Sequence, residues 1–279
     1  MPDSRPRRCA VLGQPIAHSL SPLLHRAAYA ALGLNSWTYE AIECDESQLA
    51  GLVAASGDDV VGYSCTMPLK RTVLQVADAV SEKAAAIGAA NTLLRVDQDW
   101  YADNTDWIGI QNALAERGIS ARGNVVLLGA GGTAQAALAA LTEAETVTVL
   151  VREPARALAL RDTADRLDVP IAVVRLDGGD SEDAWLRQAD LIISTLPAGA
   201  ADPLARRVWS SSQALLDAIY HPWPTQLARA MTEAGASVVG GADLLLHQAA
   251  RQVELMTGNA APIPAMRAAL PESGLAAEL

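Results

Sequence analysis

A glycine-rich turn near the middle of the chain carries the clearest chemical pattern in the sequence. Small residues follow the apolar run Asn124–Leu128 and precede an alanine-rich stretch typical of a helix; they are Gly129, Ala130, Gly131, Gly132, Thr133 and Ala134. In this GxGxxA pattern Gly129 permits a tight turn, Gly131 lets the backbone approach a pyrophosphate, and Ala134 lets the helix pack closely on the strand. The helix N-terminus adds free N–H groups and positive potential. The turn predicts a dinucleotide site; the alternative is a tight strand-to-helix connection without a ligand.

The end of the next predicted strand gives opposing signals about which dinucleotide binds. Val151 ends that strand, and Arg152, Glu153 and Arg156 follow it. Two arginines suit the 2′-phosphate of NADP, whereas an acidic residue suits the ribose 2′-hydroxyl of NAD. We expect NADP, with NAD as the alternative. The interpretation that the arginines only begin a solvated helix stays open.

Polar residues in the first third form a second set of candidates. Ser19 and Ser21 lie where a loop opens a helix, so their hydroxyls and nearby N–H groups could bind a carboxylate. Ser21 could equally be only an N-cap. Lys70 is expected in the first turn of a helix beginning near Pro68, where the helix dipole disfavours a cation unless an anion is close. A surface lysine is the simpler interpretation of this residue taken alone.

Two further polar groups have a simple structural interpretation beside the chemical one. Asn91 begins a predicted strand, and the cluster Asp103–Asp106 lies between Trp100 and Trp107. Asn, Asp and Thr are common turn and N-cap residues, so spacing alone assigns no chemistry to them.

The overall composition limits the classes of protein that remain. A chain of 279 residues with 51% hydrophobic and 19% charged residues can bury a sizeable core, and its length favours two domains. The formal charge of −11 disfavours binding to nucleic acid or anionic membranes. The cysteines Cys9, Cys44 and Cys65 have no CxxC spacing, and the histidines are dispersed, so we expect no disulfide framework and no metal. A cytoplasmic location is the natural expectation.

Short β-rich runs alternate with helical stretches along the chain, which predicts an α/β protein with parallel sheets. The runs of the first third are Cys9–Gly13, Trp37–Cys44, Val60–Thr66 and Asn91–Val96, with helices beginning near Ser21, Asp45 and Pro68. Six later runs are typical of a doubly wound sheet; they are Asn124–Leu128, Thr146–Val151, Pro170–Arg175, Asp190–Thr195, Leu215–Tyr220 and Ala236–Gly241. Helices are expected over 106–117, 242–258 and 262–270.

Several segments, in order along the chain, resemble the motifs of the shikimate dehydrogenase family. They are GQPIAHSLSPLLH (Gly13–His25), GYSCTMPLK (Gly62–Lys70), GAANTL (Gly88–Leu93), ADNTDWIG (Ala102–Gly109), DAIYHPWPTQL (Asp217–Leu227) and GADLLLHQA (Gly241–Ala249). Because they span both series of strands, the resemblance covers residues 13 to about 258.

This resemblance implies a Rossmann-type dinucleotide domain inserted into a smaller α/β substrate domain built from both chain ends. The expected bounds are residues 1–106 with 242–279 for the substrate domain and 107–241 for the dinucleotide domain. The family reduces 3-dehydroshikimate reversibly to shikimate with NADPH. Small-molecule ligands are therefore expected, without nucleic acid or membrane partners, and a homodimer is left open.

The resemblance also implies roles for individual residues. Ser19, Ser21 and Thr66 would hold the substrate carboxylate. Lys70, Asn91, Asp106 and Gln248 would hold its hydroxyl groups, and Tyr220 would line the cleft. Lys70 and Asp106 would form one acid/base unit, because a lysine ammonium can stabilise and protonate a developing alkoxide while a carboxylate keeps it charged. The candidate cofactor contacts are the glycine turn, Arg152 and Arg156, together with Thr195 and Gly241.

The sequence departs from the family pattern at informative positions. Ser64 stands where the family commonly has Asn, so it is a candidate substrate contact only. Val151, Arg152 and Glu153 replace a common NRT segment, which keeps the cofactor question open. A quinate or aminoshikimate dehydrogenase that uses NAD, and a non-catalytic NADP-binding sensor, are the alternative functions.

Overall fold

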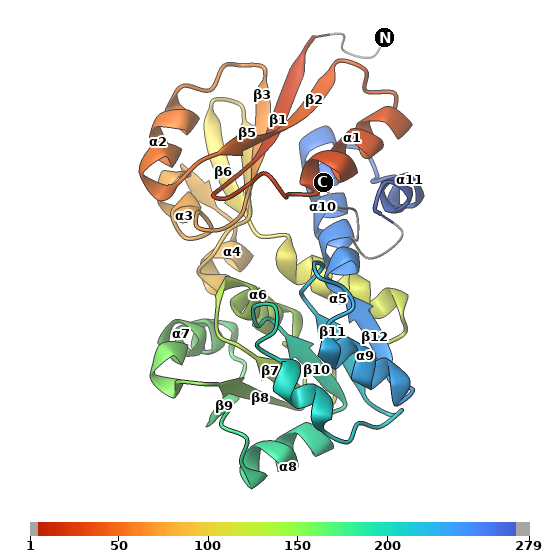
Figure 1. The fold of residues 1–279 in the computed structure, drawn as a ribbon. Coiled ribbons are helices and arrows are strands. Elements are labelled where there is room, and N and C mark those ends of the chain that lie inside the picture. The colour runs from red at the N-terminus through yellow and green to blue at the C-terminus, as the bar shows by residue number, and fades with distance from the viewer. Residues whose placement is uncertain (1–4, 272–279) are drawn as a thin grey trace. The chain divides into compact units, whose positions relative to one another are not determined.

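The computed structural model describes residues 5–271 and has an α/β fold (Figure 1). Its contacts divide these residues into two compact units. Unit 1 contains residues 5–105 and 246–270, and unit 2 contains residues 106–245 and 271. The chain therefore leaves unit 1 once and returns to it, and the return falls inside one helix, α10 (Gly241–Thr257).

Unit 1 is built on a six-stranded sheet with the order β2-β1-β3-β5-β6-β4. The strands are β1 (Arg7–Gly13), β2 (Trp37–Glu43), β3 (Val60–Cys65), β4 (Ala79–Val80), β5 (Thr92–Val96) and β6 (Asp99–Asp103). β1 pairs in parallel with β2 and β3, whereas β5 pairs antiparallel with both β3 and β6. The expectation of a parallel sheet is therefore wrong for unit 1. The antiparallel β5–β6 pair is a hairpin, in whose turn Asp97 takes a positive φ of 54°.

The helices of unit 1 confirm some predicted starts and correct others. They are α1 (Ser21–Ala31), α2 (Glu46–Ala54), α3 (Val73–Val76), α4 (Glu82–Ile87), the main part of α10, and α11 (Ile263–Ala268). α2 begins next to Asp45 as expected, and the structure adds that the Asp45 side chain caps it by accepting from the N–H groups of Ser47 and Gln48. Leu20, not Ser21, is the N-cap of α1, and Ser21 is its first helical residue.

The prediction of a helix beginning near Pro68 is wrong. Residues 67–72 form turns, and α3 begins only at Val73. Lys70 therefore lies in a turn and not in the first turn of a helix. The supposed conflict between its charge and a helix dipole does not arise.

Unit 2 is a fully parallel, doubly wound sheet with the order β12-β11-β10-β7-β8-β9. Its strands are β7 (Asn124–Leu128), β8 (Thr146–Val151), β9 (Ile171–Arg175), β10 (Leu191–Ser194), β11 (Ala214–Asp217) and β12 (Ser237–Gly240). All six predicted runs form strands. α5 (Asp106–Glu116) precedes β7. The helices and 3-10 turns between the strands are α6 (Gly132–Ala140), η1 (Pro154–Ala157), α7 (Leu158–Leu167), α8 (Asp180–Gln188), η2 (Asp202–Arg206) and α9 (Gln226–Glu233). The strand order reverses between β7 and β10, the place where such sheets bind ligands.

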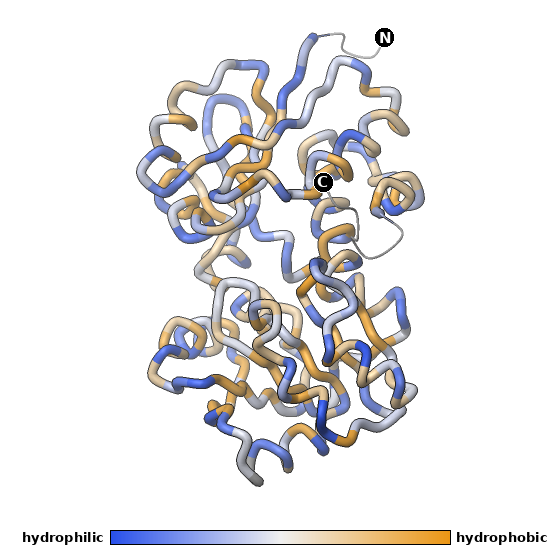
Figure 2. Tube along the Cα trace, viewed as in Figure 1, coloured by the Kyte–Doolittle hydropathy of each residue, from blue (hydrophilic) through white to orange (hydrophobic). Residues whose placement is uncertain are grey.

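Buried side chains cover both faces of the unit 2 sheet. Along β7, Val125 and Leu127 belong to one hydrophobic cluster, while Val126 and Leu128 belong to another. Successive side chains of a strand point to opposite faces, so each face has its own core. A strand buried on both faces must be apolar along nearly its whole length. Figure 2 shows hydrophobic colour along the central strands of unit 2.

Candidate active site

The glycine turn has the geometry that its sequence predicts. Gly129 has a φ of +104°, and a Cβ there would lie 2.6 Å from the Thr195 hydroxyl oxygen. Gly131 is the N-cap of α6 and makes no side-chain capping bond, and a Cβ on it would meet nothing within 4 Å. Ala134 is fully buried in the core cluster between the sheet and α6. Glycine is therefore required by conformation at residue 129, whereas at residue 131 it leaves space open beside the helix N-terminus.

Thr195 and Gly241 are each fixed by backbone contacts. The Thr195 hydroxyl and backbone N–H both donate to the Leu128 carbonyl oxygen at 2.9 Å, which places Thr195 directly against the glycine turn. A Cβ on Gly241 would lie 2.3 Å from the Ala218 carbonyl oxygen, so close packing of two backbones requires glycine there. A cofactor contact of Gly241 stays a prediction.

One of the charged residues after β8 has an ion-pair partner that the sequence did not indicate. Arg152, Glu153 and Arg156 are all exposed, and the Arg156 N–H donates to the Glu153 carbonyl oxygen at 3.0 Å. The Glu153 carboxylate pairs with the Arg175 guanidinium at 3.8 Å. Arg175 ends the neighbouring strand β9, and this long-range pairing could be found only from the sheet order.

These residues fit a dinucleotide. The open space at Gly131 and the uncapped N-terminus of α6 suit a pyrophosphate. The arginines after β8 and β9 supply positive charge at the position where the adenosine ribose binds in this kind of sheet.

Asn91, Thr105 and Gln248 form a buried hydrogen-bonded cluster in unit 1. The Asn91 amide nitrogen donates to the Thr105 hydroxyl at 3.0 Å and to the Gln248 amide oxygen at 3.2 Å. The Thr105 N–H donates to the Asn91 amide oxygen at 2.8 Å. The structure thus brings together Asn91 and Gln248, which lie 157 positions apart in the sequence.

A second residue of α10 extends this cluster. The Gln252 amide donates to the Asn91 carbonyl oxygen at 3.1 Å and to the Thr92 hydroxyl at 2.9 Å. Its amide oxygen accepts from the Ser64 hydroxyl at 2.8 Å, and Ser64 in turn accepts from the Tyr39 hydroxyl at 2.6 Å. The Ser64 hydroxyl therefore both accepts and donates a hydrogen bond within the protein. Gln252 follows Gln248 by four residues, so helical spacing could have indicated it.

The loop after β1 and the turn after β3 lie against each other. A Cβ on Gly13 would lie 2.4 Å from the Thr66 side chain and 2.8 Å from the Met67 carbonyl oxygen, so only glycine fits there. The Gln14 N–H donates to the same Met67 oxygen at 3.0 Å. The two segments that contain the predicted carboxylate-binding residues are thus neighbours.

The serine and lysine candidates occupy defined places in these segments. The Ser19 hydroxyl oxygen accepts from the Ser21 N–H at 3.3 Å, at the start of α1. The Lys70 carbonyl oxygen accepts from the Ala90 N–H at 2.7 Å, which ties the 67–72 turn to the residue before Asn91. Lys70 is half-buried, as is Thr66.

Two candidates belong to unit 2. Asp106 is the first residue of α5 and is buried, directly after Thr105 in the chain. Tyr220 follows β11 and is half-buried, and burial raises the pKa of its hydroxyl.

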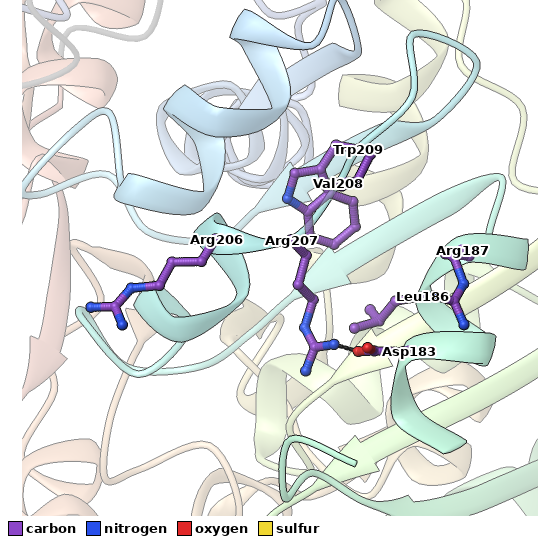
Figure 3. Close-up of a pocket in the computed structure, with 7 residues that line it drawn as sticks. All are labelled: Asp183, Leu186, Arg187, Arg206, Arg207, Val208 and Trp209. Carbon is purple, nitrogen blue, oxygen red and sulfur yellow. Dashed lines mark ion pairs between the residues drawn. The ribbon is translucent and has the colours of Figure 1, made fainter. Parts of the chain in front are cut away.

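A pocket of about 280 Å³ in unit 2 is formed by none of the predicted residues. Figure 3 shows Arg207 directed toward Asp183, with Trp209 above it and Arg206 pointing away. Across residues 5–271 there is no group of three His, Cys, Asp or Glu side chains placed to hold a metal, and no helix there has the length and apolarity to cross a membrane.

Comparison with known proteins gives three family matches along the chain. Residues 11–93 match the shikimate dehydrogenase substrate binding domain, and residues 241–270 match the shikimate 5′-dehydrogenase C-terminal domain. Residues 125–239 match the saccharopine dehydrogenase NADP binding domain.

Several proteins that align with nearly the whole chain are also shikimate dehydrogenases. A shikimate dehydrogenase (NADP(+)) of Moorella thermoacetica is 34% identical over 275 residues, which are 95% of this chain and 92% of the relative. The chain belongs to the shikimate dehydrogenase family. The crystal structure of the Mycobacterium tuberculosis shikimate dehydrogenase has a TM-score of 0.86 at 43% identity, covering 95% of this chain and 98% of that one. The Thermus thermophilus shikimate 5-dehydrogenase in complex with NADP(H) and shikimate has a TM-score of 0.82 at 34% identity, covering 94% and 98%.

Membership of the shikimate dehydrogenase family confirms the resemblance and the predicted fold class. The substrate binding match includes the Ser19, Ser21, Thr66, Lys70 and Asn91 segments, and the NADP binding match includes the glycine turn. The roles of the individual residues stay predictions.

Proposed function

We propose that this protein catalyses the reversible, NADPH-dependent reduction of 3-dehydroshikimate to shikimate. The Moorella thermoacetica relative is named as a shikimate dehydrogenase (NADP(+)), and the similar Thermus thermophilus structure holds NADP(H) and shikimate. Residues 1–106 with 242–279 would bind the substrate, and residues 107–241 would bind the dinucleotide.

The observation that carries this proposal is the hydrogen-bonded path from Lys70 to the residue before Asp106. The Lys70 carbonyl accepts from Ala90, the next residue Asn91 is bonded to Thr105, and Asp106 follows Thr105 in the chain. The backbones of the two proposed catalytic residues are thus linked through one buried polar cluster. A turn held in this way can present a side chain with little loss of order on substrate binding.

Proton transfer in this reaction is assigned to Lys70. When bound, NADPH supplies a hydride to the ketone carbon. Negative charge then builds on the ketone oxygen, and the Lys70 ammonium stabilises this charge and donates its proton there. The Asp106 carboxylate is assigned the role of orienting this lysine. In the reverse direction neutral Lys70 accepts the hydroxyl proton of shikimate.

Substrate binding is assigned to the polar groups of unit 1. Ser19, Ser21 and Thr66 would bind the carboxylate, because hydroxyl and N–H donors are gathered at the start of α1. The Asn91 and Gln248 amides would bind ring hydroxyls, and Tyr220 is kept as a candidate substrate contact. Ser64 already bonds Tyr39 and Gln252, which favours a supporting role over a direct substrate contact.

An assay with shikimate or quinate and with NADP⁺ or NAD⁺ tests the proposal. The rate is measured as the change in absorbance of the reduced nicotinamide. We expect the highest kcat/KM for shikimate with NADP⁺. Higher kcat/KM for quinate or with NAD⁺ would favour the alternative dehydrogenase. Tight NADPH binding with no turnover of 3-dehydroshikimate would favour a sensor and contradict the proposal.

We also propose that the enzyme works in the cytoplasm, where a reducing environment suits its three buried free cysteines. A homodimer is the assembly to test by sedimentation, and a monomer at micromolar concentration would contradict it.

A further inference from the structure

The ion pair between Glu153 and Arg175 bears on the choice of cofactor. Glu153 follows Arg152 at the end of β8, the place where a Rossmann-type sheet meets the adenosine ribose. A free carboxylate here would repel a 2′-phosphate and would instead accept a hydrogen bond from a 2′-hydroxyl. Taken alone, Glu153 therefore disfavours the cofactor that Arg152 and Arg156 favour.

The structure places a third arginine against this carboxylate. Arg175 ends β9, where it pairs in register with Val151, and the Leu176 N–H donates to the Val151 carbonyl oxygen at 2.8 Å. The Arg175 guanidinium lies 3.8 Å from the Glu153 carboxylate. The backbone ladder thus fixes both ends of the pair at the carboxyl edge of the sheet.

We propose that Arg175 neutralises Glu153 and thereby gives the 2′-phosphate subsite its preference for NADP over NAD. The inference rests on the proposed use of NADP. Arg175 is a positioning residue here, since it acts on the phosphate through Glu153. With this pair formed, the charge at the subsite is set by Arg152 and Arg156, which suits a phosphate dianion.

The size of the effect follows from exposure. The side chains of Arg175 and Glu153 are 57% and 52% exposed, so solvent and salt screen their interaction. Loss of Arg175 is expected to weaken binding of a 2′-phosphate by about 3- to 10-fold at low salt and by less at high salt.

Calorimetric titration with two cofactor fragments separates this effect from catalysis. Adenosine 2′,5′-bisphosphate carries the 2′-phosphate, and adenosine 5′-monophosphate lacks it. The variants are Arg175→Ala, Glu153→Ala and the double variant Glu153→Ala/Arg175→Ala. Arg122→Ala is the matched control, because Arg122 also forms an exposed pair, with Glu143 at 2.7 Å, but precedes β7 at the opposite edge of the sheet.

We expect Arg175→Ala to weaken the bisphosphate alone, and the double variant to bind it as well as Glu153→Ala does. Arg122→Ala should change neither fragment. An unchanged affinity ratio in Arg175→Ala would overturn the inference, and so would a double variant as weak as Arg175→Ala, because the effect would then not pass through Glu153. If the unmodified protein does not distinguish the two fragments, the proposed use of NADP fails as well.

Discussion

The proposed catalytic role of Lys70 can be tested separately from cofactor binding by a single substitution. Lys70→Ala removes the proposed proton donor but leaves the hydrogen bond from Ala90, which uses the backbone carbonyl of residue 70. We expect kcat to fall by about 10²- to 10⁴-fold, the usual contribution of a general acid. The Kd for NADPH, measured by fluorescence titration, should stay within about twofold.

Lys83→Ala in α4 is the matched control for loss of a lysine, and its kcat should equal that of the unmodified protein. Turnover by Lys70→Ala at the normal rate would reject the acid/base role. A parallel loss of NADPH affinity would show that Lys70 supports the cofactor site instead.

The buried histidine of α1 predicts a pH-dependent stability. His25 is fully buried, stacks on Tyr39 with ring centroids 3.9 Å apart, and contacts the Gln252 amide oxygen at 3.4 Å. Burial lowers the pKa of this imidazole from 6.5 to about 3. Below pH 6.5 this imidazole is therefore protonated in the unfolded chain but stays neutral in the folded chain. The free energy of unfolding present above pH 6.5 thus decreases as the pH falls toward 3.

At about pH 5 this linkage removes about 2 kcal/mol of unfolding free energy. His25→Phe keeps a ring against Tyr39 but cannot titrate, so its unfolding free energy should fall less between pH 7 and 5. Urea unfolding at several pH values measures the difference. The exposed His18→Phe is the control, and equal pH slopes for His25→Phe and the unmodified protein would contradict the prediction.

Motif spacing singled out candidate site residues but not the residues that support them. Ser19, Lys70 and Asn91 stand out because motif spacing contains them, whereas Gln252 and Arg175 gain their importance from partners 161 and 22 positions away. Such pairs depend on which strands become neighbours, and local sequence does not contain that information. Ser21 also shows the limit of cap prediction, since Leu20 takes the N-cap position despite the favourable hydroxyl.

At the level of elements, two glycines of the turn between β7 and α6 are needed for different reasons, one for backbone conformation and the other for open space. Gly129 has a positive φ and no room for a Cβ, whereas Gly131 has a φ of −85° and open space. We expect Gly129→Ala to lower the unfolding free energy by about 1 to 3 kcal/mol. Gly131→Ala should change it by less than about 0.5 kcal/mol but weaken NADPH binding at least about tenfold, because its methyl group occupies space beside the helix N-terminus.

Urea unfolding and NADPH titration of both variants, each serving as control for the other, test this division. Equal loss of stability in the two variants would contradict it. Normal NADPH affinity in a well-folded Gly131→Ala variant would show that the pyrophosphate does not approach this glycine.

The strands of unit 2 were predictable because they are mainly apolar runs, which burial of the central strands on both faces requires. The hairpin strand β6 was not predicted, since Asp99 and Asp103 at its ends are typical of turns. The segment at Pro68 has a proline in a position typical of a helix start, yet it forms turns packed against Gly13 and Ala90. Tertiary contacts here override the local signal.

At the scale of the whole molecule, all three cysteines lie in unit 1, so the rate at which their thiols react can measure the unfolding of that unit. Cys9, Cys44 and Cys65 are buried and free. Burial raises the pKa of Cys9 to about 12 and also raises the pKa of Cys44 and Cys65. Because the thiolate is the reactive form, a thiol reagent at about pH 8 should not label the folded protein.

Labelling should then proceed only through unfolding of unit 1, and all three thiols should react in concentrated urea. Shikimate, proposed to bind unit 1, should slow labelling in proportion to 1 + [shikimate]/Kd, because the ligand stabilises the folded state alone. A chromogenic disulfide reagent measures the rate. Rapid labelling of the folded protein would contradict the burial of these thiols, and a rate independent of shikimate would contradict the assignment of its site to unit 1.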